Sequence, residues 1–360
     1  MALAESPSFI ASDVLEAEWG AFYSSGGFDR CLLIADQYVT ELHPVRLAPF
    51  LREIHSDDCY YISGGEAVKS LPEVVRLVHW LMEHEATRRT LLVAVGGGAL
   101  LDFVGFVAAI YKRGIPCIYV PTTLMAMIDA SIGGKTAIDH EGVKNILGAF
   151  ALPRAVFIDP LFLRTLPTPE ILSGYWELVK YGLLSSCDLW QRIKAFDPLE
   201  SSEGWLPFIR DCVAIKESFV ARDFMDKGLR QWLNLGHTIG HALEGYSHHI
   251  GVQHGGRLLR HGEAVGIGLF CELYLSHKLF QADRRYLSEL EMLLRAYHSP
   301  YGFSCKHYKE ILTLLHQDKK NDCAEVSFMA FKSLGFLEKR NCSDEHLLDA
   351  LDFYREMFGH

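Results

Sequence analysis

The sequence predicts an α/β protein: an N-terminal Rossmann-like parallel-sheet domain followed by a mainly α-helical C-terminal domain. Short apolar strand patterns alternate with helical patterns up to about residue 160, one of those strands runs into a glycine turn, and long helical patterns dominate thereafter. We therefore place the domains at 1–160 and 161–360. A chain of 360 residues is long enough for both.

Five short runs form the expected strands of the first domain. They are rich in Val, Ile, Leu and Tyr and are punctuated by Gly, Pro or Asp, which is the pattern of buried parallel strands. The runs are CLLIAD at 31–36, CYYIS at 59–63, LLVAV at 91–95, CIYVP at 117–121 and AVFID at 155–159.

Four long helical patterns follow in the second domain, where the strand signal fades. The most loop-like stretch of this half is GYSHHIGVQHGGRLLRHGE at 245–263. The helical patterns are EILSGYWELVKYGLL at 170–184, IRDCVAIKESFVARDF at 209–224, GEAVGIGLFCELYLSHKLF at 262–280 and DEHLLDALDFYREMF at 344–358.

Composition excludes several classes of protein. The formal net charge of -10 disfavours nucleic acid and anionic membrane as partners. No stretch approaches the apolar length of a membrane helix, and the N-terminus lacks the basic start and apolar run of a secretory signal. The nine cysteines include no CxxC pair, which favours reduced thiols. We expect a cytoplasmic protein without a membrane or nucleic-acid partner.

The stretch LLVAVGGGALLDFVGF predicts a strand, a glycine turn and a helix. Such a turn lets backbone amides at a helix N-terminus approach a pyrophosphate. The stretch is not GxGxxG, because Leu101 takes the place of the third glycine. The alternative interpretation is a tight turn that has only a structural role and binds no ligand. Asp102 lies one turn into the helix, where it serves the helix dipole or holds a nicotinamide amide.

The stretch PTTLMAMIDASIGGKTAIDHEGVKNILGAF is denser in polar groups than a structural loop requires. It interleaves Asp129, Lys135, Lys144 and Asn145 with small residues that permit close backbone approach. Each lysine taken singly is explained by a solvated surface. Taken together, these residues indicate a surface that binds an anion.

Two histidines and a glutamate indicate a metal site. His237 and His241 are four residues apart in a helical stretch, so their imidazoles leave one face of the helix. Glu177 lies in an otherwise apolar helix, three residues before Lys180. A carboxylate with two histidines is a common catalytic zinc set with one open position. The alternatives are core histidines and a surface ion pair, and RHGEAVGIG supplies a further candidate, His261.

Eight motifs together resemble one family. By these motifs the chain is identified as a member of the 3-dehydroquinate synthases, which are sugar phosphate cyclases, over roughly residues 30 to 340. The motifs are GGGALLDFVGF, RGIPCIYVPTTLMAMIDASIGGKTAID, KNILGAF, FLRTLP, ELVKYG, GLRQWLNLGHTIGHALE, HGEAVGIG and DKKND.

The resemblance implies a dehydroquinate synthase-like fold and a phosphate-eliminating carbon–oxygen lyase of the shikimate pathway of aromatic amino acid biosynthesis. The implied reaction converts 3-deoxy-arabino-heptulosonate 7-phosphate to 3-dehydroquinate and phosphate. It proceeds by transient oxidation with NAD, phosphate elimination, reduction and intramolecular aldol closure. The implied cofactors are NAD and Zn²⁺, with Co²⁺ as the alternative metal, and the implied assembly is a homodimer.

The resemblance also implies site residues. The metal ligands are Glu177, His237 and His261, while His241 faces the substrate. NAD contacts Asp36, Glu66, Lys69, Gly97, Gly98, Asp102, Thr122, Thr123, Asp129, Lys135, Lys144, Phe162 and Thr165. The substrate set is Arg113, Asp129, Lys135, Lys144, Asn145, Lys180, Lys216, Arg230, Asn234, His241 and Lys319, with Arg113 offered across the dimer interface. The catalytic residues among these are Lys135, Lys180, Lys216, Arg230, Asn234 and His241.

The third metal ligand has two candidates. The segment after His237 is longer than the family usually has and adds His248, His249 and His254. Distance from His237 favours His254. Local chemistry favours His261, because a strongly patterned helix starts directly after it, whereas His254 lies among glycines. We assign His261.

Three other functions compete. An NAD- and metal-dependent polyol dehydrogenase of the glycerol dehydrogenase type has a neutral substrate, which has no use for the five cations Lys144, Lys180, Lys216, Arg230 and Lys319, and these would be costly to bury unpaired. A sister cyclase acts on another sugar phosphate, and such sisters tend to differ at positions matching Lys216, Asn234 and His241, which here agree with the dehydroquinate synthase pattern. A non-catalytic binding protein has no need of an intact ligand set.

Overall fold

The computed structural model describes residues 8–11, 15–52, 54–200, 204–248, 252–254, 256–317 and 325–359. The chain divides into two compact units. The first unit comprises Met1–Pro167 and Glu200–Ser218, and the second comprises Thr168–Leu199 and Phe219–His360. The first unit therefore takes up a segment from the middle of the chain as well as the N-terminal part.

The first unit is built on a parallel sheet of six strands in the order β1-β8-β5-β4-β2-β3. All five predicted strands are confirmed. The sequence did not reveal β1, a four-residue edge strand that pairs with β8. The strands are β1 (Ser8–Ala11), β2 (Arg30–Asp36), β3 (Cys59–Ile62), β4 (Thr90–Gly96), β5 (Cys117–Pro121) and β8 (Ala155–Ile158).

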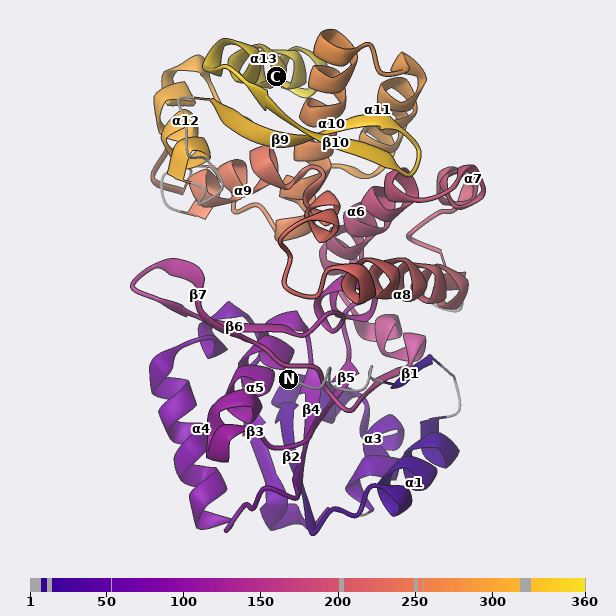
Figure 1. Cartoon of the computed structure of the whole chain (residues 1–360), viewed down its shortest axis with the longest axis vertical. Helices are drawn as coiled ribbons and strands as arrows, with labels where there is room; N and C mark the ends of the chain where they lie inside the picture. The colour runs from indigo at the N-terminus through magenta and orange to yellow at the C-terminus, as the bar shows by residue number, and fades with distance from the viewer. Residues whose placement is uncertain are drawn as a thin grey trace. The chain divides into compact units, whose positions relative to one another are not determined.

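The connections between these strands reverse direction between β2 and β4. The chain leaves β2 toward the β3 edge, whereas from β4 it proceeds to β5 on the other side. Right-handed crossovers then place the two sets of helices on opposite faces, and Figure 1 shows α4 and α5 on one side of the sheet and α1 and α3 on the other. The helices are α1 (Leu15–Ser25), α2 (Gln37–Leu42), α3 (Pro44–Leu51), α4 (Leu71–Glu83) and α5 (Gly98–Ile110).

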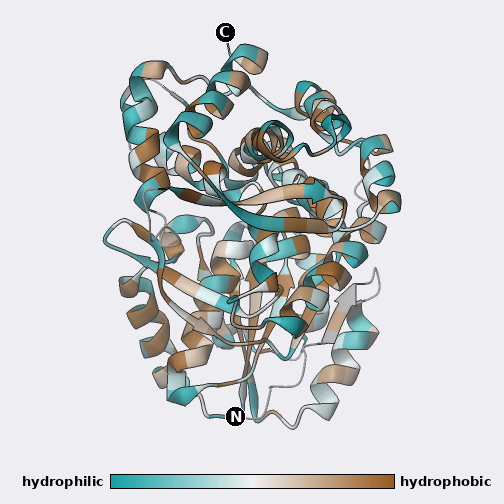
Figure 2. Cartoon of the chain, turned by 45° about the horizontal axis from the view of Figure 1, so that its top comes forward, coloured by the Kyte–Doolittle hydropathy of each residue, from teal (hydrophilic) through white to brown (hydrophobic). Residues whose placement is uncertain are grey.

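Helices on both faces explain the composition of the central strands. Every residue of β4 is buried, as are Cys31–Ala35 of β2. Because neither face meets water, these strands are continuously apolar rather than alternating, as the brown strands of Figure 2 illustrate. Each fully buried Val, Leu or Ile contributes on the order of 1.5–3 kcal/mol to folding.

A β-hairpin follows β5 where the sequence suggested a polar, loop-like stretch. Its strands are β6 (Lys135–His140) and β7 (Val143–Phe150), which pair antiparallel. The two residues of the turn, Glu141 and Gly142, both have positive φ, at 49° and 77°. Positive φ at both central positions is the geometry that matches the twist of a two-residue hairpin.

The second unit is mainly helical, as predicted, and also contains a two-stranded antiparallel sheet that the sequence did not reveal. The four predicted long helices are confirmed as α6, α8, α10 and α13, although α8 belongs to the first unit as far as Ser218 and only its last turn belongs to the second. The elements are α6 (Thr168–Leu184), α7 (Cys187–Ala195), α8 (Trp205–Arg222), α9 (His237–Tyr246), α10 (His261–Phe280), α11 (Arg284–Tyr297), α12 (Tyr308–Gln317), α13 (Asp344–Phe358), β9 (Val326–Ser333) and β10 (Phe336–Cys342).

Glycines on α10 let two other helices approach its backbone closely. A Cβ at Gly262 would lie 1.8 Å from the carbonyl oxygen of Ser173, and one at Gly266 would lie 2.9 Å from the Trp176 ring, both on α6. A Cβ at Gly268 would lie 1.9 Å from the carbonyl oxygen of Gly236, just before α9. Larger side chains on α10 would therefore push α6 and α9 away.

In the part of the chain that the structure describes, no helix combines the length and apolar character needed to cross a membrane. The cysteines within that part are free thiols, consistent with the predicted reduced state, while Cys323 lies outside it.

Candidate functional site

Polar and glycine residues gather at the carboxyl ends of β2, β4 and β5. Asp36 ends β2, and its side chain accepts the N–H of Tyr38 at 2.9 Å, which caps α2. Thr122 follows β5 and donates its N–H to the carbonyl of Gly96 at 3.0 Å. The crossovers reverse between β2 and β4, and in open α/β sheets ligands bind outside the carboxyl ends of strands at such a point.

The turn after β4 contains glycines at positions where neighbouring side chains approach the backbone closely. Gly97 is the N-cap of α5, and no side chain caps that helix. A Cβ at Gly97 would lie 3.1 Å from Thr123, and one at Gly98 would lie 2.9 Å from Ala130. An uncapped N-terminus carries a partial positive charge, so this turn fits the pyrophosphate of a dinucleotide.

Lys69 connects two predicted site residues of the first unit. Its Nζ lies 3.0 Å from Oδ2 of Asp102 and donates to Oδ1 of Asn145 at 2.5 Å. Burial raises the pKa of Asp102 to about 6, and the neighbouring Lys69 opposes this rise. The structure thus brings a predicted cofactor residue of α5 together with a predicted substrate residue of β7. Asn145 adopts a positive φ of 52°.

Lys216 and Asp129 form a second pair in the first unit. The Nζ of buried Lys216, on α8, lies 2.9 Å from Oδ1 of Asp129 and donates to the main-chain carbonyl of Asp129 at 2.7 Å. Asp129 belongs to a short π-helical segment, Ala126–Ala130. This double contact orients both side chains.

The remaining predicted residues of the first unit lie at several places. Phe162 is buried in the 3-10 segment Pro160–Thr165, and the Thr165 hydroxyl lies 2.6 Å from Nε2 of His43. Exposed residues of this group are Glu66 in the 3-10 segment Glu66–Val68, Arg113 in the 3-10 segment Tyr111–Arg113, Lys135 on β6 and Lys144 on β7.

In the second unit, Glu177 is entirely buried on α6 and faces three nitrogen atoms. Its Oε2 lies 2.6 Å from Nζ of Lys180, and its Oε1 lies 3.3 Å from Nε2 of His237 and 3.2 Å from Nε2 of His261. The predicted surface-pair alternative for Glu177 and Lys180 is therefore wrong, because both side chains are buried.

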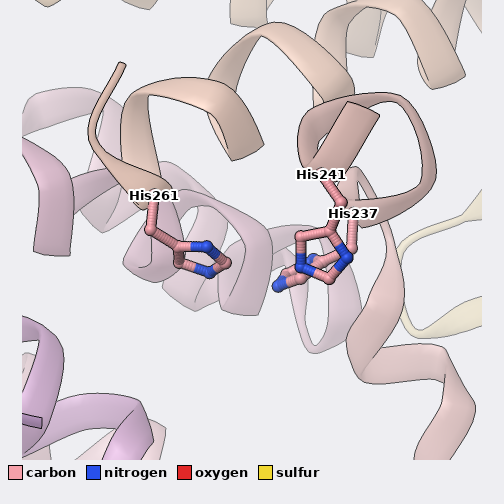
Figure 3. Close-up of side chains that lie close together, drawn as sticks. All are labelled: His237, His241 and His261. Atoms are coloured by element: carbon pink, nitrogen blue, oxygen red, sulfur yellow. The ribbon is translucent and has the colours of Figure 1, made fainter. Parts of the chain in front are cut away.

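Three histidine rings surround one point. The rings of His237 and His241 are 5.1 Å apart between centroids, and that of His261 is 5.4 Å from His237 and 5.6 Å from His241. One nitrogen from each lies within 4.8 Å of the others. Figure 3 shows His237 and His241 leaving α9 on one side, with His261 at the start of α10 on the other. His241 is the most exposed of the three.

These groups shift one another's pKa values. Burial alone would raise the pKa of Glu177, but Lys180 and the two histidines outweigh burial and hold it well below its ordinary value. Burial lowers the pKa of His237, against the attraction of Glu177. For His261, burial is outweighed by hydrogen bonds to Glu177 and Glu244, which raise its pKa to about 10. The cluster therefore holds an anionic carboxylate in a buried setting.

The structure reveals Glu244, which sequence reasoning missed. It lies on α9 and accepts a hydrogen bond at 3.0 Å from Nδ1 of His261, the nitrogen away from Glu177. A carboxylate on the far nitrogen fixes the tautomer and direction of a ligating imidazole. The spacing could have predicted its position. Glu244 is seven residues after His237 and three after His241, so all three share one helix face.

A loop between α8 and α9 presents Arg230, which is buried. The guanidinium donates to the carbonyl of Phe224 at 2.8 Å, and the loop is held by Asp223, whose carboxylate accepts the N–H of Lys227, Gly228 and Arg230. Arg230 belongs to the 3-10 segment Leu229–Asn234, and Asn234 is half-buried at the end of that segment.

The structure describes the three histidines of the inserted segment and Lys319 only in part. Nε2 of His248 lies 3.3 Å from the carbonyl of Leu259. The backbone of His254 belongs to the 3-10 segment Val252–His254, and its side chain is outside what the structure describes. His249 and Lys319 lie outside the described residues.

A divalent cation fits the cluster of Glu177 and the histidines. Both carboxylate oxygens of Glu177 are buried, with Oε2 beside Nζ of Lys180 and Oε1 beside Nε2 of both His237 and His261. A buried carboxylate that faces imidazole nitrogens matches the ligand types that zinc and cobalt prefer. Either Glu177 or His241 completes a three-ligand set with His237 and His261.

Family models and curated relatives agree on what this chain is similar to. The model described as 3-dehydroquinate synthase N-terminal matches residues 59–173, and the model described as 3-dehydroquinate synthase C-terminal matches residues 174–321. A 3-dehydroquinate synthase from Parabacteroides distasonis is 36% identical over 99% of this chain and 100% of its own length. One from Chlorobium luteolum is 39% identical over 82% of this chain and 83% of its own.

Solved structures share the fold. A 2-deoxy-scyllo-inosose synthase, complexed with carbaglucose-6-phosphate, NAD⁺ and Co²⁺, is 25% identical with a TM-score of 0.82, covering 97% of this chain and 96% of that one. A 2-epi-5-epi-valiolone synthase from Streptomyces hygroscopicus is 24% identical with a TM-score of 0.84, covering 99% of both chains. On the two family models and the full-length relatives, the chain belongs to the 3-dehydroquinate synthase family.

Proposed function

We propose that this chain converts 3-deoxy-arabino-heptulosonate 7-phosphate to 3-dehydroquinate and phosphate, the reaction of its family. The observation that carries the proposal is the buried Glu177 carboxylate facing His237 and His261 in a chain that matches both family models. The enzyme is a phosphate-eliminating lyase of the shikimate pathway, and NAD is consumed and regenerated within each turnover.

Glu177, His237 and His261 hold a divalent metal, zinc or cobalt, in this proposal. The geometry of Glu177 supports this set, because Lys180 is beside its Oε2 while its Oε1 faces the nitrogens of His237 and His261. His241 is more exposed than the other two histidines and faces the substrate. When bound, the metal acts as a Lewis acid that lowers the pKa of substrate hydroxyls.

NAD binds in the proposal at the carboxyl ends of β2, β4 and β5. The uncapped N-terminus of α5 at Gly97 receives the pyrophosphate, and Asp36 at the end of β2 is placed for a ribose hydroxyl. When bound, the nicotinamide supplies a hydride acceptor that is restored before product leaves. The 2-deoxy-scyllo-inosose synthase with NAD⁺ and Co²⁺ supports both cofactors.

Side chains of the chain bind the substrate's carboxylate and phosphate. Lys180 is held by Glu177 and Lys216 by Asp129, so each ammonium group has a fixed direction. A fixed cation loses less conformational freedom when it binds an anion than a mobile one. Asp223 does the same for the loop that carries Arg230. Lys135, Lys144, Asn145, Asn234 and Lys319 complete the proposed set.

A polyol dehydrogenase is the main rival, since it needs the same two cofactors. Buried Lys180, Lys216 and Arg230 argue against it, because cationic side chains in a binding site match an anionic substrate rather than a neutral polyol. A sister cyclase is the second rival. The curated relatives favour a 3-dehydroquinate synthase over it, being 36% and 39% identical against 25% for the inosose synthase structure.

The proposal includes a homodimer in the cytoplasm. Exposed Arg113, in the 3-10 segment after α5, is the residue that each chain offers to the partner's substrate phosphate. Free thiols among the described cysteines agree with a reducing compartment.

Substrate discrimination tests the function. The zinc-loaded enzyme with NAD is given the heptulosonate phosphate, glucose 6-phosphate or glycerol, and products are identified by mass spectrometry with phosphate assayed alongside. We expect phosphate and a cyclic product from the heptulosonate phosphate alone. Turnover of glucose 6-phosphate would indicate a sister cyclase, and oxidation of glycerol a dehydrogenase.

A further inference from the structure

A buried carboxylate outside the proposed ligand set accepts backbone hydrogen bonds at the start of α9. Glu272 lies on α10 and is entirely buried. Its Oε2 accepts the N–H of Gly236 at 2.8 Å, and its Oε1 accepts those of Thr238 at 3.1 Å and Ile239 at 3.3 Å. The two backbone amides nearest His237 along the chain, one before and one after it, thus donate to the same side chain.

The start of α9 needs such a partner from elsewhere. The N-cap of α9 is Gly236, with φ at +79° and no side chain to receive the first N–H groups of the helix. A serine or aspartate at this position would place its Cβ within 2.7–2.9 Å of Leu269. The usual capping residues are therefore excluded by the close approach of α10, and Glu272 of that helix supplies the acceptor.

The first turn of α9, which Glu272 caps, determines the direction of the His237 side chain. His237 is the first residue of α9, with its Nδ1 3.1 Å from the carbonyl of Leu235 and its Nε2 3.3 Å from Oε1 of Glu177. A shift of the first turn would move the imidazole directly, because only the Cβ atom separates the ring from this backbone. Glu272 also lies on the helix that begins with His261, so one rigid element fixes both histidines.

We propose that Glu272 is a positioning residue for the metal centre. It binds the backbone N–H groups on both sides of His237 and so keeps the imidazole directed toward the proposed metal position between Glu177 and His261. This inference rests on the proposed function in one respect, the metal held by those three residues. The alternative is a helix cap that stabilises the fold and has no effect on the metal.

The test compares two variants of α10 in the full chain. Glu272→Gln keeps the shape of the side chain but replaces one acceptor oxygen with an amide group that opposes the backbone N–H donors. Ser276→Ala is the matched control. Ser276 is also buried on α10. Its hydroxyl donates to the main-chain carbonyl of Glu272 at 2.6 Å and accepts the N–H of Phe331 on β9 at 2.9 Å, so its loss alters α10 contacts but leaves the Glu272 carboxylate and its bonds to α9 in place.

The readouts are zinc affinity by chelator competition, the visible absorption spectrum of the Co²⁺-loaded protein and the thermal midpoint. We expect both variants to lower the midpoint. Glu272→Gln should also weaken zinc binding about 10–100-fold and change the cobalt spectrum, whereas Ser276→Ala should keep the wild-type affinity and spectrum. If Glu272→Gln does not fold, Glu272→Asp is measured instead, with the same expectation of weakened metal binding.

Two outcomes overturn the inference in distinguishable ways. A Glu272→Gln protein that loses thermal stability but keeps wild-type zinc affinity and cobalt spectrum shows that Glu272 is a structural cap, and the proposed metal centre then stands. A wild-type chain that binds no zinc or cobalt removes the metal centre itself, and the inference with it.

Discussion

Oε1 of Glu177 lies 3.3 Å from Nε2 of His237 and 3.2 Å from Nε2 of His261, although the three residues belong to three different helices. The convergence depends on α10, whose glycines let α6 and α9 approach its backbone. Glu244 then orients His261, and Glu272 holds the turn that carries His237.

The identity of the third metal ligand is tested by two alanine variants. His261→Ala should lose bound zinc and activity, because it removes a nitrogen that faces Glu177 from the rigid start of α10. His254→Ala should keep both. Metal content after dialysis, measured by atomic emission, decides the matter. Loss of zinc in His254→Ala with retention in His261→Ala would transfer the ligand to the inserted segment.

Close helix packing predicts a strong effect of one methyl group. Gly268→Ala places its Cβ 1.9 Å from the carbonyl oxygen of Gly236, so α9 must move away. We expect a loss of about 1–3 kcal/mol or more in unfolding free energy and weaker zinc binding. The control is Gly302→Ala, since nothing lies within 4 Å of a Cβ there. Equal stability and zinc affinity in the two variants would refute the packing argument.

Much of this fold was predictable because its strands and helices carry strong local patterns. Four of the five apolar runs, those of β2, β4, β5 and β8, are buried on both faces, which makes them stand out from their surroundings, and the fifth, β3, is a partly exposed edge strand. Strands β6, β7 and β10 were missed because they are partly exposed and contain several charged residues, such as Glu338, Lys339 and Arg340. Their pairing is set by tertiary contacts rather than by composition.

The candidate site was predictable only in part. The histidine spacing and the family motifs pointed to Glu177, His237 and His261, which the structure brings together. Glu272 gave no signal, because its partners are backbone amides 33 to 36 residues away in sequence. Contacts of that kind arise from how helices pack, which a one-dimensional pattern does not encode.

A buried histidine predicts acid sensitivity of the fold. Burial lowers the pKa of His298 to about 3, below its ordinary value of 6.5, and its Nε2 lies 2.9 Å from the Tyr354 hydroxyl. Between pH 6.5 and 3 the unfolded chain binds a proton that the folded chain does not. The contribution of neutral His298 to the free energy of unfolding is therefore complete above pH 6.5. As the pH falls below 6.5, it decreases by up to about 1.4 kcal/mol per pH unit.

The variant His298→Gln isolates this effect. Its thermal midpoint at pH 7.5 should be lower than that of the wild type, because a buried contact is altered. Between pH 6.5 and 4.5, however, its midpoint should fall less steeply with pH than the wild-type midpoint. Parallel curves over that range would mean that His298 takes up its proton in the folded state as readily as in the unfolded one.

The proposed role of Arg113 predicts complementation between inactive chains. Arg113→Ala and Lys144→Ala should each be inactive alone, whereas mixing them should restore part of the activity, since a mixed dimer holds one intact site. Subunit exchange is monitored by native mass spectrometry of differently tagged chains. If exchange is complete and activity stays absent, Arg113 does not act on the partner's site.

In the proposed reaction, NAD is regenerated within each turnover. This is tested by measuring how many equivalents of product form per equivalent of NAD. The zinc-loaded enzyme is given a large excess of the heptulosonate phosphate over NAD, with phosphate, 3-dehydroquinate and the absorbance of NADH followed together. We predict many equivalents of phosphate and 3-dehydroquinate per NAD, in equal amounts, with no accumulation of NADH. Product limited to one equivalent per NAD, with NADH rising in step, would contradict the account and identify a dehydrogenase.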